Sequence, residues 1–455
     1  NFFNFSNSLR KNKMRCKKKS VLSLFSGCGG MDLGFEGGFE VLKKSSNQHF
    51  DADSIDGVFQ EYFIKLPPTS FRTVFSNDIR PGAKAAWENH FSKFGIPKGT
   101  FHLESIVDLV KRARQGLFQF PEDIDIVTGG FPCQDFSVAG KRKGFNSNKS
   151  HFGELLNHVD NPTLENRGML YMWMREVVDL TRPKMFIAEN VKGLISLSEA
   201  KTIIENDFKS IGNDGYLVVS ARVLNAAEFG VPQGRERVIF YGFRKDLLKK
   251  DALEALSSIN VCDEYDPYPQ PTHSFNKNSE LLPIVTVKDV LSSLPEPEDS
   301  NDPSQKTYSK AKWYGKHCQG QIEVNLNGVG PTIRSEHHGN IEYRRLALEH
   351  GGKYNDELKK GLKERRLTIR ECARIQAFPD DYEFIISANR GNIPVSGSEA
   401  YKLIGNAVPP LLAYHIAKRV EKIWSILFNL DEDKIFSEVF EKEQKCEQLL
   451  LFEAS

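Results

Sequence analysis

The sequence lacks paired cysteines and long hydrophobic runs. Its seven cysteines are an odd number, and no two of them form a Cys-x-x-Cys motif, so neither a disulfide framework nor a zinc ribbon is indicated. No run of about eighteen apolar residues occurs, and the polar, Asn-rich start has no apolar signal-peptide core. We therefore expect a protein of the reducing cytoplasm that is neither secreted nor inserted into a membrane.

A strong excess of one charge is also missing. Lys and Arg together number 61 and Asp and Glu 60, for a formal net charge of +1, so the total charge does not indicate a nucleic-acid partner. The charge is nevertheless uneven, with six basic residues within 11–19 and a second basic stretch at 334–374. A solvated helix face accounts for only part of this second stretch.

Strand and helix patterns alternate over the first half of the 455 residues, which are enough for one large and one smaller core. A strand over 20–26 runs into a glycine turn and a helix over 31–37, as in the first unit of a nucleotide-binding βαβ fold. Further strands are expected over 71–76, 102–106, 123–128, 184–188 and 216–224, and helices over 83–90, 170–180 and 200–210. These patterns predict an α/β fold. We expect 38–69 to be an inserted surface excursion, and 245–366, which is richer in Pro, Asn, Ser and Gly, to be a second, irregular domain.

Several chemically useful side chains are predicted to meet at one edge of this sheet. Cys133 follows the strand over 123–128, and ligands bind outside the carboxyl ends of such strands, although a cysteine taken alone is more often a small buried hydrophobe. Glu189 ends a neighbouring strand, and Arg235 and Arg237 stand two apart and so face one side. A thiolate adds to an electron-poor carbon, a carboxyl group donates a proton to a ring nitrogen, and arginine holds a carbonyl oxygen. The set predicts nucleophilic activation of a pyrimidine ring.

Six motifs in this order and spacing resemble the DNA (cytosine-5)-methyltransferase family of the bacterial restriction-modification type, from Val21 to about Val420. They are SLFSGCGGMDLGFE, TGGFPCQDFSVAGKRKG, AENV, VPQGRERV, RLTIRECARIQAFPDDY and YKLIGNAVPP. The resemblance implies a Rossmann-like S-adenosylmethionine-dependent methyltransferase domain with a mixed, mostly parallel sheet, and a smaller irregular target-recognition domain. The implied organisation is a basic N-terminal extension at 1–20, a catalytic and cofactor-binding domain at 21–245 with 396–455, and the recognition domain and hinge at 246–395.

The resemblance also implies a mechanism on a cytosine flipped out of a specific duplex sequence. Cys133 would add to carbon 6, Glu189 would hold ring nitrogen 3 and the exocyclic amine, and Asn190 would brace the strand end. Arg237 and Arg235 would hold the base carbonyl and the surroundings of the nucleophile. Carbon 5 would then take a methyl group from S-adenosylmethionine, leaving S-adenosylhomocysteine.

The cofactor residues implied by the resemblance lie mainly at the first two strand ends. Asp78, at the tip of the second strand, is the ribose partner that such folds predict. Ser23 stands where the family usually has an acid. The full expected set is Phe25 and Ile79 on the adenine faces, Gly27, Cys28, Gly29 and Gly30 near the methionine end, Glu104 near the adenine amine, Pro132 and Leu170 along the pocket, and Asn406 with Ala407 closing it.

The expected partner is double-stranded DNA, contacted through Gln134, Ser137, Thr332 and Arg334. A metal is not expected, because His337-His338 has no cysteine or acid at ligand spacing. We expect a monomer, without a stable complex with any cognate restriction endonuclease.

Two other functions remain open for this sequence. An RNA cytosine methyltransferase could use the same scaffold, although the long recognition segment and the PCQDFS loop favour the DNA enzymes. A catalytically silent DNA-binding regulatory subunit would not need Cys133, Glu189 and Arg237.

Overall fold

The computed structural model describes residues 18–46, 62–132, 170–196, 200–212, 215–318, 320–335, 341–388 and 393–429. Cys133, Gln134, Ser137, His337 and His338 lie outside the described residues.

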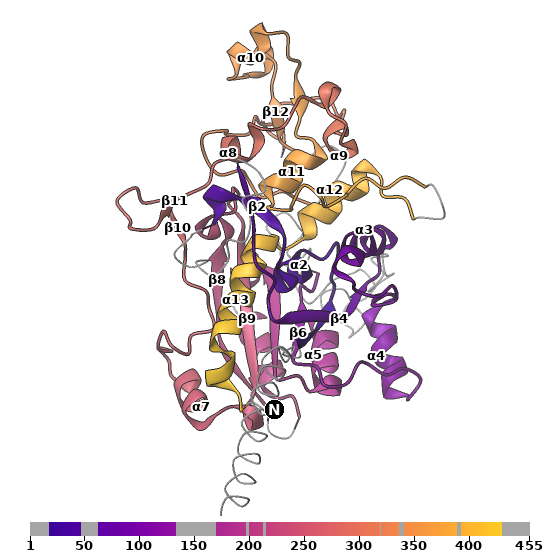
Figure 1. Cartoon of the computed structure of the whole chain (residues 1–455), viewed down its shortest axis with the longest axis vertical. Helices are drawn as coiled ribbons and strands as arrows, with labels where there is room; N and C mark the ends of the chain where they lie inside the picture. Colours follow the sequence, from indigo (N-terminus) through magenta and orange to yellow (C-terminus); the bar gives the residue numbers. More distant parts are fainter. Residues whose placement is uncertain are drawn as a thin grey trace, which may run out of the picture.

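A seven-stranded sheet forms the centre of the molecule, in the order β5-β4-β1-β6-β7-β9-β8 (Figure 1). The first five of these strands run parallel, and β9 runs antiparallel to both of its neighbours. The strands are β1 (Lys19–Leu24), β4 (Phe71–Asp78), β5 (Phe101–Leu103), β6 (Ile126–Gly129), β7 (Met185–Val191), β8 (Tyr216–Asn225) and β9 (Glu236–Arg244). The predicted α/β fold with a mixed, mostly parallel sheet is confirmed.

The sheet is covered on both faces because its strands are apolar on both sides. Val21 and Met185 contribute to one core, whereas Leu22 and Phe186, their neighbours in sequence, contribute to the other. Helices α2 (Gly30–Glu36), α3 (Pro81–Phe91), α7 (Lys250–Ser257) and α13 (Pro410–Leu427) pack in the first core, and α4 (Ile106–Arg114), α5 (Leu170–Thr181) and α6 (Ala200–Lys209) in the second. This three-layer arrangement leaves the strand ends as the place for a site.

Two local expectations are corrected. The strand expected over 102–106 ends at Leu103, because Ser105 caps α4 by accepting a hydrogen bond from the Val107 amide. The expected surface excursion at 38–69 is wrong for its described residues, since β2 (Glu40–Leu42) pairs with β3 (Phe63–Lys65) and the flanking apolar side chains are buried. Val41, Leu42 and Ile64 pack in the first core and hold these short strands there.

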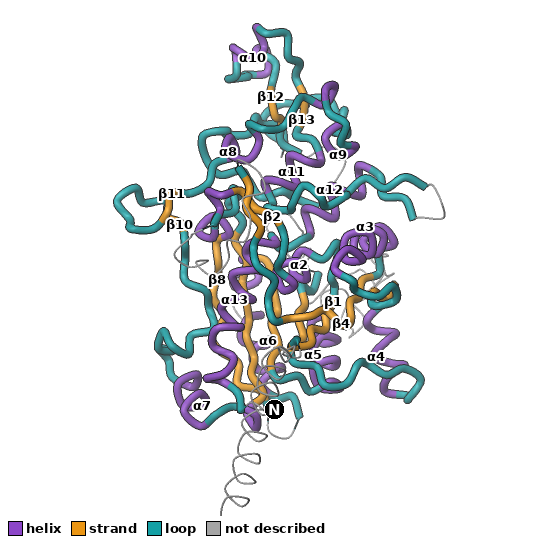
Figure 2. Tube along the Cα trace, in the orientation of Figure 1, coloured by secondary structure: helices purple, strands orange, loops and turns teal. Residues whose placement is uncertain are grey.

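The second, irregular part of the chain is built mostly of loops, seen as the teal segments in the upper part of Figure 2. From α8 to α11, no α-helix in the described ranges exceeds seven residues. These helices are α8 (Val287–Leu291), α9 (Pro303–Lys306), α10 (Asn355–Lys359) and α11 (Ile369–Ile375), with strands β10 (His273–Ser274), β11 (Leu282–Pro283), β12 (Tyr343–Arg345) and β13 (Arg365–Arg366). The longer α12 (Gly397–Asn406) leads back to the sheet.

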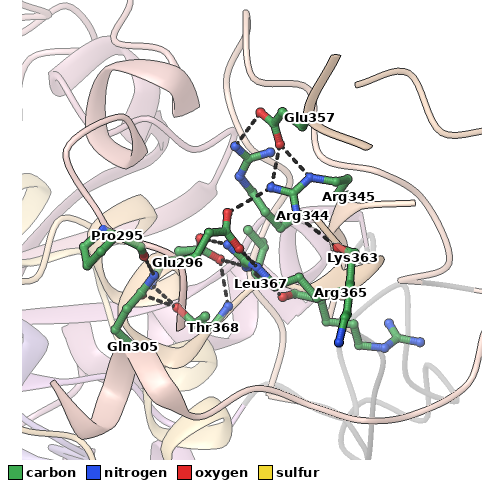
Figure 3. Close-up of polar contacts among 12 residues, drawn as sticks. Pro295, Glu296, Gln305, Arg344, Arg345, Glu357, Lys363, Arg365, Leu367 and Thr368 are labelled. Atoms are coloured by element: carbon green, nitrogen blue, oxygen red, sulfur yellow. Dashed lines mark hydrogen bonds and ion pairs between the residues drawn. The ribbon is translucent and has the colours of Figure 1, made fainter. Parts of the chain in front are cut away.

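Buried ion pairs hold this part together (Figure 3). Arg345 has a fully buried side chain and contacts Glu296 at 2.9 Å and Glu357 at 2.6 Å. Arg365 contacts Glu296 at 2.9 Å and the buried Glu371 at 2.8 Å. Burial alone would raise the pKa of Glu296, but hydrogen bonds and charge from Arg365 and Arg345 lower it to about 2. Much of the positive charge of the basic stretch at 334–374 is therefore neutralised by acidic side chains inside the protein. Removing one partner of such a pair would be costly, because it would leave the other charge buried without a counter-charge.

Candidate active site

A buried carboxylate and a guanidinium meet where β7 and β9 run side by side. Arg237 Nε lies 2.7 Å from Glu189 Oε1, and each side chain is only 10% exposed. Burial raises the pKa of Glu189 above its ordinary value, and the charges of Arg237 and Arg235 oppose that rise. The arrangement gives a carboxyl group that accepts a proton more readily than one in water.

The segment that leads to Cys133 passes directly beside this pair. A Cβ atom added to Gly130 would lie 2.8 Å from Glu189 Oε2, so only glycine fits there without displacement. The Asn190 side-chain amide donates a hydrogen bond of 3.1 Å to the Phe131 carbonyl. Asn190 thus holds the chain two residues before Cys133, which itself lies outside the described residues.

Arg235 has different partners from Arg237. Its guanidinium is 1% exposed and donates to the carbonyls of Ile333 at 3.0 Å, Gly405 at 2.7 Å and Ala407 at 2.9 Å. The side chain therefore joins three segments that are far apart in sequence. A contact between Arg235 and the base stays a prediction.

Two glutamines that sequence reasoning missed complete this junction. Gln233 accepts from the Ile333 amide at 3.1 Å and donates to Gln376 at 2.5 Å, and Gln376 donates to the Ala407 carbonyl at 2.6 Å. Thr332 donates from its hydroxyl to the Gly234 carbonyl at 2.8 Å. The sequence did carry a signal for these two glutamines, because each is a polar residue inside an otherwise apolar or glycine-rich motif. A buried side-chain amide needs hydrogen-bond partners, so such a residue is expected to link segments.

Replacing Gly405 with alanine should destabilise this junction by about 1–3 kcal/mol, the usual cost of overpacking. The added Cβ would lie 2.3 Å from the Arg334 carbonyl carbon and 2.4 Å from the Ser335 nitrogen, and backbone cannot rotate away. Urea denaturation of both proteins measures the loss. Gly234→Ala is the matched control, because its nearest neighbour would be 3.7 Å away and stability should change little. Equal stability of the Gly405 variant and wild type would contradict the tight contact.

The glycine turn after β1 is open on one side. Gly27 has a φ of +54° and no heavy atom within 4 Å of an added Cβ, while its amide donates to Asp78 Oδ2 at 3.0 Å. Burial raises the pKa of Asp78. Phe25 has a φ of +53°, an uncommon conformation for an aromatic residue, and Ile79 is 41% exposed. Strain, an exposed apolar side chain and open space beside the turn fit a bound ligand.

The opposite side of the turn is closed by the segment after α12. An added Cβ at Gly30 would lie 2.2 Å from the Val408 carbonyl oxygen and 3.1 Å from Ala407 Cβ. Asn406, the last residue of α12, is exposed. The structure thus brings the expected closing residue Ala407 against the glycine turn.

The other expected cofactor residues are placed as follows. Cys28 is buried, and burial raises the pKa of its thiol, so it is unreactive. Glu104 contacts Arg112 at 2.5 Å, Pro132 is partly buried, and the buried Leu170 begins α5. Gly29 is packed against Trp87 and Phe91. Their roles toward a cofactor stay predictions.

Asp32 supplies a buried acid that the sequence prediction did not identify. Its carboxylate accepts hydrogen bonds from Ser23 at 2.5 Å, Trp87 at 2.6 Å and Ser76 at 3.3 Å. Burial raises its pKa to about 6, against the lowering effect of these hydrogen bonds. The acid on α2 therefore ties β1, β4 and α3 together behind the glycine turn, and Ser23 serves as its donor.

In the described ranges, no group of three His, Cys, Asp or Glu side chains could hold a metal ion. No helix within these same ranges is long and apolar enough to cross a membrane.

Comparison with solved structures first defines the fold. The fold is similar to that of the Dnmt2 methyltransferase of S. pombe, with a TM-score of 0.50, 16% sequence identity, and coverage of 89% of this chain and 98% of that one. This likeness shows the fold alone.

Sequence comparison then defines the family. The C-5 cytosine-specific DNA methylase family model matches residues 19–422. The Type II methyltransferase M.BsuRI of Bacillus subtilis is 30% identical over 434 residues, 92% of this chain and 82% of the relative. M.BspRI of Lysinibacillus sphaericus, another Type II methyltransferase, is 32% identical over 421 residues, 89% of this chain and 81% of the relative. The chain therefore belongs to the C-5 cytosine-specific DNA methylase family, which implies S-adenosylmethionine as methyl donor and DNA as substrate, as the motifs predicted.

Proposed function

We propose that this DNA (cytosine-5)-methyltransferase protects DNA in a type II restriction-modification system by methylating one cytosine of a specific duplex sequence. The relatives at about 30% identity carry the name Type II methyltransferase, which supports this role. The observation that carries the catalytic part is the Glu189–Arg237 pair beside Gly130, three residues before Cys133. A cognate endonuclease would act on the same sequence without a stable complex with this monomer.

Catalysis begins with the flipped-out base beside Glu189. Extruding a base costs a few kcal/mol, which contacts in the pocket must offset. The Cys133 sulfur forms a bond to carbon 6 while Glu189 delivers a proton to nitrogen 3, so negative charge does not build up on the ring. A free thiol has a pKa of about 8.5, so concerted protonation makes the attack practicable near neutral pH. Arg237 orients the Glu189 carboxyl group and faces the base carbonyl.

Addition of the thiolate makes carbon 5 electron-rich. When bound, S-adenosylmethionine supplies the electrophilic methyl group that carbon 5 takes. Loss of the carbon-5 proton then returns an electron pair to the ring, breaks the carbon–sulfur bond and releases the Cys133 thiolate. Nitrogen 3 then returns its proton to Glu189, and the base is restored with the carbon-5 hydrogen exchanged for methyl.

The open glycine turn and the carboxylate beside it fit the methyl donor. Asp78 would accept hydrogen bonds from ribose hydroxyls, and Phe25 and Ile79 would enclose the adenine. The backbone at Gly27 would approach the methionine end, and residues 406–407 would close the pocket. The open space at Gly27 supports this assignment.

Recognition of DNA falls to residues 246–395, and the catalytic domain comprises 21–245 with 396–455. Thr332 and Arg334 would contact the backbone beside the flipped base, and Gln134 and Ser137 would contact DNA from the loop after Cys133. The Ile333 amide donates to Gln233 and the Ile333 carbonyl accepts from Arg235, which supports a fixed position for this segment. Phosphate contacts set position, while a few side chains read base edges.

Replacing Asp78 with asparagine should raise the KM for S-adenosylmethionine about tenfold, the worth of one hydrogen bond to a charged group. Asparagine keeps the size of the side chain but loses one acceptor, and its amino group would face either the ribose or the Gly27 amide. Steady-state kinetics at saturating DNA measure the change, and kcat should change less than KM. An unchanged KM would remove Asp78 from the ribose.

The overall proposal is tested with labelled S-adenosylmethionine and either mixed-sequence duplex DNA or transfer RNA. We expect 5-methylcytosine in DNA. Transfer to RNA alone would identify the RNA enzyme, and no transfer to either would favour the silent DNA-binding subunit. Resistance of the methylated DNA to a restriction endonuclease then tests protection.

A further inference from the structure

A cleft of about 420 Å³ lies between the recognition part and α12. One wall is the loop 307–311, another is the segment with Arg334 and Ser335, and the third is the first half of α12. Ile341, buried among these walls, forms part of the floor. The cleft therefore continues from the segment that the proposed function places beside the flipped base.

The described lining of the cleft is positive and rich in hydroxyl groups. Lys310, Arg334 and Lys402 line it, together with serine and threonine side chains, and no Asp or Glu is among the described lining residues. Lys310 Nζ lies 3.6 Å from the centre of the Tyr308 ring, a contact that orients the ammonium group without neutralising it. Such a set of donors suits an anion with several oxygens.

The geometry of α12 adds to this preference. Ser398 and Lys402 are four residues apart, so they share one face of the helix, and Ser398 lies in the first turn, where amide groups point outward. Glu399, the acid in the first turn, is held by Arg80 through contacts of 2.8 Å and 3.0 Å. The single acid of α12 is thus committed to a partner on another element.

The buried Arg366 fixes one wall and the floor of the cleft. It donates to the carbonyls of Ala311 and Ile341, both of which line the cleft, and also to Gly320 at 2.7 Å. Tyr343 donates to the Ala311 carbonyl at 3.3 Å. The cleft is therefore held in shape before any ligand binds, which lowers the entropic cost of binding.

We propose that this cleft binds a phosphodiester group of the DNA strand next to the target cytosine, with Lys310 and Lys402 as the contacting cations. The inference rests on the proposed function, since it takes DNA as the ligand. Each phosphate neutralised by a cation releases counterions, so it contributes about 0.9 to the slope of log affinity against log salt concentration.

The test measures binding of a mixed-sequence duplex by fluorescence anisotropy over a range of salt concentrations, with S-adenosylhomocysteine present. The Lys310→Gln/Lys402→Gln double variant should bind about tenfold more weakly and show a salt slope reduced by about 0.9, the contribution of one phosphate. Its affinity for S-adenosylhomocysteine and its melting temperature should match the wild type. Lys250→Gln/Lys422→Gln, with two exposed lysines on α7 and near the end of α13, is the matched control and should keep the wild-type slope.

Two results would overturn the assignment. An unchanged slope in the Lys310/Lys402 variant would exclude a phosphodiester contact. Stabilisation by inorganic phosphate in the wild type but not in the variant, with the same DNA slope in both, would assign the cleft to a free anion instead. Absence of DNA methylation by the wild type would refute the proposed function. The salt slopes would still show, independently of methylation, whether the cleft contacts a DNA phosphate.

Discussion

Replacing Cys133 with serine should abolish both methyl transfer and covalent trapping. Duplex DNA in which 5-fluorocytosine replaces cytosine blocks the last step, because fluorine cannot leave as a proton does. The wild-type enzyme with S-adenosylmethionine should then form an adduct that survives denaturation, whereas the serine variant should form none, since its hydroxyl is a far weaker nucleophile. Denaturing gel electrophoresis measures the adduct.

The control for this experiment is Cys262→Ser. Cys262 is an exposed free thiol, so it tests whether accessibility alone produces an adduct. Its replacement should leave trapping unchanged. An adduct formed by the Cys133 variant, or lost in the Cys262 variant, would refute Cys133 as the nucleophile.

Replacing Glu189 with glutamine should lower kcat by about 10²–10⁴-fold, the usual contribution of a positioned general acid. Glutamine can still donate a hydrogen bond to nitrogen 3 but cannot transfer a proton. The raised pKa of Glu189 also predicts a pH dependence. The protonated form persists above the ordinary value of 4.5 and declines as the pH rises through the raised pKa, so kcat/KM of the wild type should fall on that alkaline side.

Arg237→Met provides the matched comparison. The charge of Arg237 lowers the pKa of Glu189, so its removal should move the alkaline fall in kcat/KM to higher pH while weakening the hold on the base. Glu189→Gln should remove this fall. Profiles of kcat/KM against pH for the three proteins measure both effects, and a fall that is unchanged in the glutamine variant would assign it to another group.

Most of the fold could be predicted from local patterns. The strand over 20–26 and the helix over 170–180 appear as β1 and α5, because buried parallel strands and amphipathic helices leave strong signals in sequence. The described residues of 38–69 were mispredicted, since strands of three residues carry almost no pattern. Likewise, Asp32 was missed, because a single acid in a helix does not reveal that Ser23, Ser76 and Trp87 will surround it.

The sequence alone was enough to predict the chemistry of the candidate site. That chemistry depends on which side chains stand in the ordered motifs, and these can be read directly from the sequence. The tertiary structure decided how the positive charges are used. Arg345 is neutralised by Glu296, which is 49 positions away, and Arg235 joins Ile333 to Gly405, whereas Lys310 and Lys402 line a cleft without an acid in its described lining. A basic side chain can be solvated, paired or directed at a ligand, and only the neighbours that folding brings from distant parts of the chain select among these states.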